Sequence, residues 1–322
     1  MRFSLPAKWE KAETDPRKIE GRTRSPGNEL WEECELIPAP FAYHRPQSLQ
    51  EAIGLLTQPG QHARVVAGGH SLIPMMKLRL AKPEQLIDLQ DLSELRGIRS
   101  ESGAMVIGAM TTQHELIGSE LLAASCPIIR ETSLVIADPQ VRYCGTLGGN
   151  LANGDPGNDM PAVMLALGAV YRAQGAQGER DIPARDFYRG IYSTALLDGE
   201  ILTAIHIPIA AEGHGWAYEK QKRKVGDYAT AAAAVVMTMA SGICTQAAIA
   251  LTNLADTPLL AQHAGEALVG SGVDEAVITE AARRAQGITS PSADVRGPVD
   301  FRVHVAGVMV RRAIARAKQR AR

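Results

Sequence analysis

Two glycine-containing segments are the residues in this sequence best suited to binding a charged ligand. Ala67-Gly68-Gly69-His70-Ser71 follows an apolar run, and Thr146-Leu147-Gly148-Gly149-Asn150 repeats the combination of paired glycines with hydroxyl and amide side chains. Glycine has no β-carbon, so successive backbone N–H groups can converge on an oxyanion while a nearby hydroxyl adds a donor. A single Gly-Gly pair is usually an ordinary turn. Two such pairs are equally consistent with a binding site for a phosphate-bearing cofactor and with two structural turns.

Other sequence motifs with known chemistry are absent. No G-x-G-x-x-G opens a helix after a strand pattern and no G-x-x-x-x-G-K-[ST] occurs, which argues against a Rossmann dinucleotide site and a P-loop. The histidines form no H-x-x-x-H or H-x-H pair and there is no G-x-S-x-G elbow, so metal hydrolysis and serine catalysis are not indicated. The cysteines form no C-x-x-C pair, which argues against iron–sulfur loops and disulfides and indicates a reducing, cytoplasmic location. We therefore expect no catalytic residue and no metal ligand on this chain.

Charge and hydropathy exclude two classes of partner. The 322 residues contain 34 basic and 35 acidic side chains, so no charge excess attracts nucleic acid or an anionic membrane. Residues Tyr228 to Ala255 carry no charge and are numerous enough to cross a bilayer. The stretch is mostly alanine, with threonine, serine, glutamine and asparagine interspersed. It predicts two buried strands that meet at Ser241-Gly242 rather than a membrane span.

The beginning of the chain predicts a polar extension followed by a small α/β subdomain. Residues 1–37 are polar and punctuated by proline and glycine, without a sustained period. Ser48 and Glu51 fit a capping box for a helix that runs through Leu56. Strands at Ala63–Ala67 and Leu86–Leu89 flank the first glycine segment. We assign this subdomain to about 38–92.

A larger mixed α+β subdomain is predicted at about 93–213. Its predicted strands are Met105–Ala109, Ala169–Ala173 and Ile201–Ile207. Its predicted helices are one from the Thr112/Glu115 capping box through Leu122, one at Ile128–Val135 and one from the N-cap Asp159 to Leu167. Residues Ala137–Asp159 are predicted as a long loop that carries the second glycine segment, and loops of this length are usually functional.

The final third, 214–322, predicts a separate domain. Its strands are predicted at Ala217–Lys222, Thr230–Ala240 and Ile243–Leu254, as a three-stranded antiparallel sheet. Helices are predicted near 258–269, 274–286 and 300–318. The expected fold class is therefore α+β, with a two-part domain at 38–213 followed by a sheet covered by helices.

The glycine segments closely resemble the two FAD signatures of the flavin subunits of molybdenum hydroxylases. The resemblance includes the continuation through Arg79 and the later run Gly154-Asp155-Pro156-Gly157-Asn158-Asp159-Met160-Pro161. Within the xanthine dehydrogenase family, it is strongest to the medium subunits of carbon monoxide dehydrogenase, and it covers about Pro38 to Lys318. It implies that residues 38–213 bind FAD and that 214–322 form a C-terminal flavoprotein domain. Both glycine segments would then wrap the FAD pyrophosphate through backbone amides and the Ser71 and Thr146 hydroxyls.

The resemblance also implies roles for single residues, each with an alternative. Asp159 matches an FAD-contacting acid, although a helix N-cap explains it equally well. Leu202 and Lys220 match flavin-contacting positions, although Lys220 is equally an exposed charge on a strand. Tyr228 would shield one face of the isoalloxazine ring, unless it is a core or sheet-edge tyrosine. His70 would contact the ring or shape its loop.

The family implies an electron-transfer subunit with no substrate chemistry of its own. A large molybdopterin-binding subunit and a small 2Fe-2S subunit are the implied partners, in a dimer of heterotrimers. Electrons would pass from the 2Fe-2S clusters through FAD to an external acceptor. Two alternatives remain open: a self-contained FAD oxidoreductase related to the enolpyruvyl-sugar reductase, and a flavin-free scaffold subunit. Neither the substrate of the complex nor its acceptor is specified by these residues.

Overall fold

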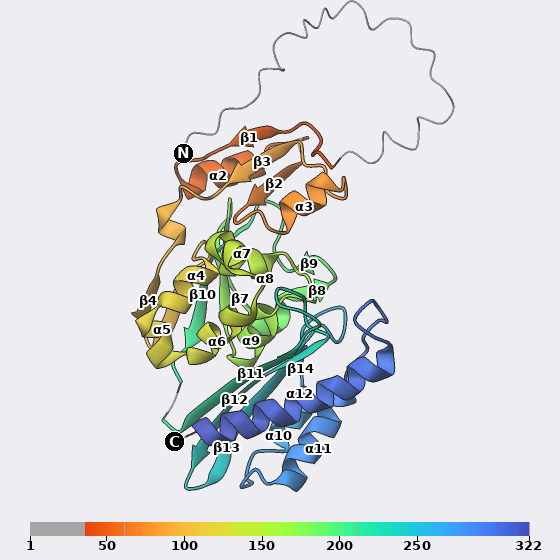
Figure 1. The fold of residues 1–322 in the computed structure, drawn as a ribbon. Helices are drawn as coiled ribbons and strands as arrows, with labels where there is room; N and C mark the ends of the chain where they lie inside the picture. The colour runs from red at the N-terminus through yellow and green to blue at the C-terminus, as the bar shows by residue number, and fades with distance from the viewer. Residues whose placement is uncertain (1–35, 61, 211, 322) are drawn as a thin grey trace, which may run out of the picture.

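In the part of the chain that the structure describes, three β-sheets and one short hairpin form the framework. The computed structural model describes residues 36–60, 62–210 and 212–321. Figure 1 shows three parts stacked in chain order, which we call the N-terminal part (36–92), the central part (93–210) and the C-terminal part (212–321). Helices and sheets are mixed throughout, so the α+β class is confirmed. The predicted extension lies outside the described residues except for Leu36 and Ile37.

The N-terminal part is a small parallel sheet with two helices. Its strands, in the spatial order β1-β3-β2, are β1 (Ala42–His44), β3 (Gln85–Asp88) and β2 (Ala63–Val66). Helix α2 (Leu49–Leu56) begins as predicted, because the Ser48 hydroxyl accepts a hydrogen bond from the Glu51 backbone N–H. The other half of the predicted capping box is wrong, because the Glu51 carboxylate accepts from the Gln47 N–H instead of the Ser48 N–H. Strand β2 leads through the first glycine segment into the short helix α3 (Leu72–Lys77). The glycine segment therefore lies at the carboxyl end of a parallel strand, where parallel α/β units place their ligands.

The central part is built on a five-stranded antiparallel sheet. The order is β4 (Ile98–Glu101), β5 (Ala104–Gly108), β10 (Ile201–Pro208), β6 (Val170–Gly175) and β7 (Gly178–Pro183). Two 3₁₀ helices, η2 (Ser93–Leu95) and η3 (Ala184–Asp186), and the hairpin β8 (Tyr188–Gly190)/β9 (Ser193–Thr194) complete this framework. Strand β10 is central, so its side chains, Leu202 among them, are largely buried.

Six short helices accompany this sheet. They are α4 (Gln113–Gly118), α5 (Glu120–Ser125), α6 (Pro127–Val135), α7 (Pro139–Cys144), α8 (Leu147–Ala152) and α9 (Met160–Ala166). The capping box at Thr112 is confirmed, because its hydroxyl accepts from the Glu115 N–H and the Glu115 carboxylate accepts from the Thr112 N–H. The helix predicted to continue through Leu122 is wrong, because Ser119 is extended and caps a new helix, α5.

The long loop predicted at 137–159 is also wrong, because it contains two helices. Asp138 caps α7 by accepting from the Val141 N–H, with Pro139 at the first helical position. Thr146 caps α8 by accepting from the Gly149 N–H. The second glycine segment is therefore the first turn of a helix rather than an open loop.

The C-terminal part contains a four-stranded antiparallel sheet, not the predicted three strands. Its order is β11 (His214–Gln221), β12 (Ala231–Ala240), β13 (Ile243–Thr252) and β14 (Leu259–Leu260). Leu259 and Leu260 pair with Leu251 and Ala250, so the helix predicted at 258–269 starts later, as α10 (Gln262–Glu266). The predicted junction of two strands at Ser241-Gly242 is confirmed, and both residues have positive φ, as in a type I′ hairpin turn.

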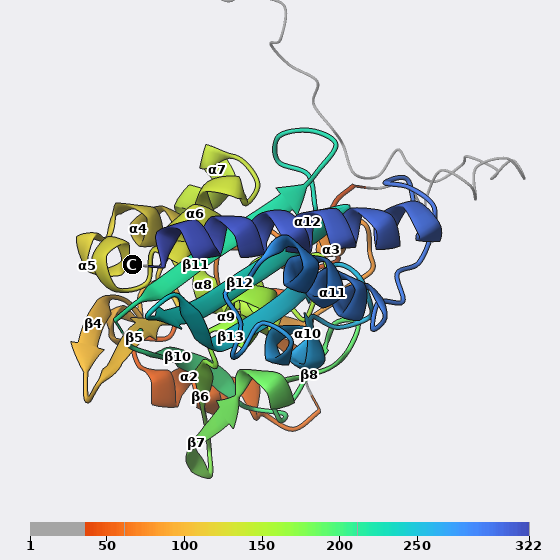
Figure 2. The ribbon, with the colours of Figure 1, turned by 90° about the horizontal axis from the view of Figure 1, so that it is seen from below.

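Two hydrophobic cores explain the uncharged run in β12 and β13. Ala232 and Ala234 face the core of the central part, where α9 packs, whereas Ala231 and Ala233 face a second core. Figure 2 shows α10, α11 (Glu275–Gln286) and α12 (Val299–Arg320) over this second face. Apart from their ends near the turn, where Ile243, Thr245 and Gln246 among others are exposed, the two strands are covered on both faces, which explains the absence of charge. None of the helices in the described ranges has the length and apolar character required to cross a bilayer.

Candidate functional site

A cavity of about 1350 Å³ lies where the three parts of the chain meet. Its walls come from the β2–α3 segment, helix α8, the β8–β9 turn, β10, and the end of β11 with the loop that follows. It brings together thirteen of the fourteen predicted cofactor-binding residues. These are Ala67, Gly68, Gly69, His70, Ser71, Thr146, Gly148, Gly149, Asn150, Asp159, Leu202, Lys220 and Tyr228. The remaining one, Leu147, is fully buried in the core of the central part.

The first glycine segment presents free hydrogen-bond donors to this cavity. The backbone N–H groups from Gly68 to Ser71 have no acceptor among the described residues. Ser71 occupies the N-cap position of α3, but its hydroxyl does not bond to the helix. Gly69 has φ +72°, a conformation that turns the chain and strains other residues. Four successive amides and one hydroxyl are thus available to an anion such as a pyrophosphate.

The second glycine segment differs from the sequence expectation, because the amides from Leu147 to Asn150 are already bonded. Leu147 N–H donates to Thr111 O (2.9 Å) and Gly148 N–H donates to Ala109 O (2.8 Å). Gly149 N–H donates to the Thr146 hydroxyl oxygen (3.0 Å). The backbone from Leu147 to Asn150 is therefore not free to bind a ligand, because it anchors α8 to the chain just after β5. The groups of this segment without a partner among the described residues include the Thr146 N–H, the Thr146 hydroxyl proton and Asn150 Oδ1.

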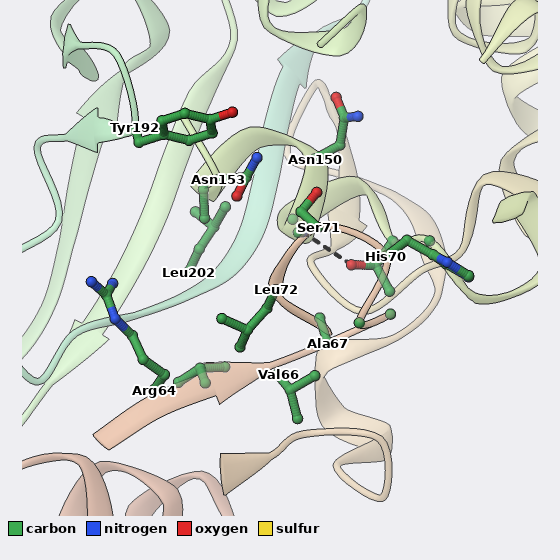
Figure 3. A pocket seen from close by; sticks show the side chains of 18 of the residues that line it. Arg64, Val66, Ala67, His70, Ser71, Leu72, Asn150, Asn153, Tyr192 and Leu202 are labelled. Carbon is green, nitrogen blue, oxygen red and sulfur yellow. Dashed lines mark hydrogen bonds between the residues drawn. The ribbon is translucent and has the colours of Figure 1, made fainter. Parts of the chain in front are cut away.

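Several polar atoms around the cavity lack partners within the described chain. Asn150 Oδ1, Asn153 Nδ2 and Gln113 Nε2 are buried without a hydrogen bond, and all three residues line the cavity. Figure 3 shows Asn150, Asn153, Ser71 and Leu202 around this space, with the His70 ring directed away from Leu202. Buried polar groups are nearly always paired in native proteins, so unpaired ones that face a cavity indicate a polar ligand. These residues fit a dinucleotide, with amides for its phosphates and amide side chains for its polar groups.

A buried ion pair closes one end of the cavity. Lys220 Nζ lies 2.7 Å from Asp159 Oδ2, and the two side chains are only 3% and 6% exposed. The Tyr218 hydroxyl donates to Asp159 Oδ1 (2.5 Å). Burial, reinforced by the Asp159 charge, raises the pKa of Tyr218 well above its ordinary value, so it remains a donor. Lys220 is therefore not the exposed charge that the sequence left as an alternative.

Asp159 departs from its other expected role. It occupies the N-cap position of α9, but its side chain makes no capping hydrogen bond. Its two carboxylate oxygens are instead engaged by Tyr218 and Lys220 from β11. The carboxylate thus joins the central part to the C-terminal part.

Tyr228 and Leu202 also reach the cavity. Leu202 is 5% exposed on β10, whereas Tyr228 is 42% exposed on the loop between β11 and β12. The exposure of Tyr228 argues against the alternative of a core tyrosine. The Tyr228 hydroxyl donates to Asp155 Oδ2 (3.2 Å), a residue that was not among the predicted ones.

Sequence reasoning missed many residues that line the cavity. Those with polar side chains include Arg64, Gln113, Asn153 and Tyr192. Gln113 follows a capping threonine, and nothing in its sequence context signals that it faces a ligand.

Comparison with known proteins identifies the family. Residues 39–210 match the model described as "FAD binding domain in molybdopterin dehydrogenase", and 216–317 match "CO dehydrogenase flavoprotein C-terminal domain". The chain is 60% identical to the carbon monoxide dehydrogenase medium chain of Afipia carboxidovorans, over 89% of this chain and all of the relative. It is 32% identical to the glyceraldehyde dehydrogenase medium chain of Sulfolobus acidocaldarius, over 86% of this chain and 98% of the relative.

A solved structure has the same fold. A chain of the Cu,Mo-CO dehydrogenase crystal structure superposes with a TM-score of 0.87 at 61% identity, over 88% of this chain and 100% of that chain. The family assignment and the geometry of the cavity agree. This chain belongs to the family of FAD-binding medium subunits of molybdenum hydroxylases of the carbon monoxide dehydrogenase type.

Proposed function

We propose that this chain binds one FAD in the cavity and transfers electrons within a cytoplasmic, heterotrimeric molybdenum hydroxylase. The observation that carries this proposal is the row of four free backbone amides at Gly68–Ser71, which face a cavity that also contains unpaired amide side chains. The proposed FAD-binding domain is 38–213, with subdomains at about 38–92 and 93–213. The proposed C-terminal flavoprotein domain is 214–322, and it closes the cavity with residues of β11 and the following loop.

Each group around the cavity has a role in this proposal. The Gly68–Ser71 amides and the Ser71 and Thr146 hydroxyls hold the pyrophosphate. Lys220, kept in place by Asp159, sets a positive charge beside the flavin, while Leu202 and Tyr228 contact its ring. When bound, FAD supplies a carrier that accepts single electrons and releases a pair.

The partners follow from the family and from the chemistry that this chain lacks. Among the described residues, no group of three or more His, Cys, Asp or Glu side chains has an arrangement that would hold a metal ion. We therefore assign the molybdopterin to a large subunit and the 2Fe-2S clusters to a small subunit, in a dimer of heterotrimers. Similarity to carbon monoxide dehydrogenase medium chains favours carbon monoxide as the substrate. The similar medium chain of a glyceraldehyde dehydrogenase supports the view that substrate selection lies on the large subunit.

Purification of the native complex through a tag on this chain tests the proposal. We expect one FAD per copy of the chain, together with molybdenum and iron. Absence of flavin would overturn the FAD assignment. Flavin without molybdenum or iron would overturn the heterotrimer and favour the self-contained oxidoreductase.

A pair of serine variants tests the anion site itself. Ser71→Ala should weaken FAD binding about tenfold, because it removes one hydrogen bond to a charged group. Ser100→Ala is the matched control, since Ser100 is exposed on β4 and does not line the cavity. Equal FAD affinity in the two variants would contradict the placement of the pyrophosphate at Ser71.

A further inference from the structure

One carboxylate joins two tyrosines that come from different parts of the chain. Asp155 Oδ2 accepts hydrogen bonds from the hydroxyls of Tyr192 (3.2 Å) and Tyr228 (3.2 Å). Tyr192 belongs to the β8–β9 turn of the central part, whereas Tyr228 lies between β11 and β12 in the C-terminal part. Both tyrosines line the cavity, but Asp155 does not. Asp155 therefore acts on the cavity through the groups that it holds, which include these two rings.

The backbone around Tyr192 is strained and is held by the segment that carries Asp155. Tyr192 has φ +54°, a left-handed conformation that bulky residues adopt only where their surroundings enforce it. The Tyr192 N–H donates to Gly154 O (2.8 Å). Gly154 also has positive φ, and a β-carbon there would lie 3.1 Å from Ser193 N. The β8–β9 turn is thus locked against residues 154 and 155.

The Tyr228 ring lies against the other end of the same segment. A β-carbon on Gly157 would lie 2.7 Å from Tyr228 Cδ1, so the ring lies directly against this glycine. Asp155 Oδ1 accepts from Gly157 N–H (2.9 Å), which fixes the carboxylate relative to that backbone. The guanidinium carbon of Arg296 lies over the Tyr228 ring, 5.5 Å from its centre, in a cation–π contact.

We propose that Asp155 is a positioning residue that holds Tyr192 and Tyr228 together as one wall of the cavity, across the boundary between the central and C-terminal parts. The inference rests on the proposed function, because the wall then controls how far the flavin is exposed. The two tyrosines are 54% and 42% exposed, so they stand between the cavity and solvent. Burial, followed by the charge of Asp155, raises the pKa of both hydroxyls, so each remains a donor at neutral pH.

Hydrogen exchange on the complex tests whether Asp155 holds the two tyrosines, and the result does not depend on bound flavin. Asp155→Ala should speed amide exchange about tenfold in residues 186–195 and 222–230 and leave β5 and β10 unchanged. Asp155→Asn should restore much of the protection, because its amide oxygen still accepts hydrogen bonds. Asp88→Asn is the matched control: Asp88 accepts from the Tyr43 hydroxyl (2.5 Å), and neither residue lines the cavity. Unchanged exchange in either segment, or faster exchange throughout the chain, would overturn the proposal.

Flavin release and flavin exposure provide the second measurement. In the FAD-loaded complex, Asp155→Ala should release FAD about tenfold faster and increase quenching of flavin fluorescence by iodide. Tyr228→Phe and Tyr192→Phe should each reproduce part of the effect and add little when combined with Asp155→Ala. If Asp155→Ala releases FAD at the wild-type rate and its flavin is quenched as in the wild type, the positioning role of Asp155 is overturned while the proposed function stands. A wild-type complex without flavin would overturn the proposed function, and the exchange experiment would still decide whether Asp155 holds the two tyrosines.

Discussion

Removal of one charge from the Asp159–Lys220 pair is the most direct perturbation of the site. Asp159→Asn keeps an oxygen for the Tyr218 hydroxyl but leaves the Lys220 ammonium, 3% exposed, without its counter-charge. A buried charge deprived of its partner destabilises a protein by about 3–5 kcal/mol. Lys220→Met should cost a similar amount, because it leaves the Asp159 carboxylate unpaired except for the tyrosine. We expect each single variant to lose about 3 kcal/mol of the free energy of unfolding.

The double variant separates this pairing from general damage. With Asp159→Asn and Lys220→Met together, no buried charge remains, so the loss should be about 2 kcal/mol smaller than the sum of the single losses, within the range of measured coupling energies. The control cycle uses Glu280 and Arg283, an ion pair whose side chains are 38% and 70% exposed, for which a much smaller coupling energy is expected because solvent screens the two charges.

Urea unfolding of the flavin-free chain provides the assay. Trp216 lies on β11, the strand that carries Lys220, and the other two tryptophans are Trp9 and Trp31. Replacing these two with phenylalanine leaves Trp216 as the single fluorescent reporter. Additivity of the two single variants within about 0.5 kcal/mol would refute a direct interaction between Asp159 and Lys220. If the coupling energy of Asp159 and Lys220 is no larger than that of the exposed pair Glu280 and Arg283, the burial of the Asp159–Lys220 pair is refuted.

Three further predictions concern stability, thiol reactivity and pH. Gly148→Ala should destabilise the flavin-free chain by at least about 1–3 kcal/mol, because its β-carbon would lie 2.5 Å from the β-carbon of Ala109; an unchanged urea midpoint would contradict this contact. In the native chain, a thiol reagent followed by peptide mapping should label the exposed Cys144 and spare Cys126, since burial raises the pKa of the Cys126 thiol to about 12; equal labelling would contradict its burial. Burial lowers the pKa of His214 below 6.5, so the unfolded chain binds the proton more readily and stability falls as the pH drops below about 6.5. His214→Asn should reduce the shift in urea midpoint between pH 7.5 and 5.5, and an identical shift would exclude His214 as a contributor.

Local signals in the sequence predicted much of the fold. The caps at Ser48 and Thr112 are specified within four residues, and both are present in the structure. The hairpin turn at Ser241-Gly242 is equally local. Strand β14 was missed because two residues are too short for a periodic pattern, and they become a strand only by pairing with Leu251 and its neighbour. Ser119 was missed as a break because both flanking segments favour helix.

The position of the site was predictable from sequence, but the state of its donors was not. The paired glycines mark both segments in the sequence, and residues of both segments line the cavity. Whether an amide is free depends on residues elsewhere in the chain. The N–H groups of Leu147 and Gly148 are bonded by Thr111 and Ala109, more than thirty residues away. Tyr218 was missed for a similar reason, because only the folded strand places it beside Asp159.

The glycines in the two segments therefore serve contact between segments as much as contact with a ligand. A β-carbon on Gly68 would lie 2.2 Å from Cys144 O, so the first segment can rest against the end of α7 only without a side chain. A β-carbon on Gly149 would lie 2.9 Å from the Thr146 hydroxyl oxygen and 3.5 Å from the β-carbon of Ala67, so the two segments also approach each other there. These backbones come close at the cavity, and only the first segment keeps a run of four successive amides free among the described residues. Loss of FAD in a glycine variant is consequently evidence about the phosphate contact only when FAD affinity falls further than stability does.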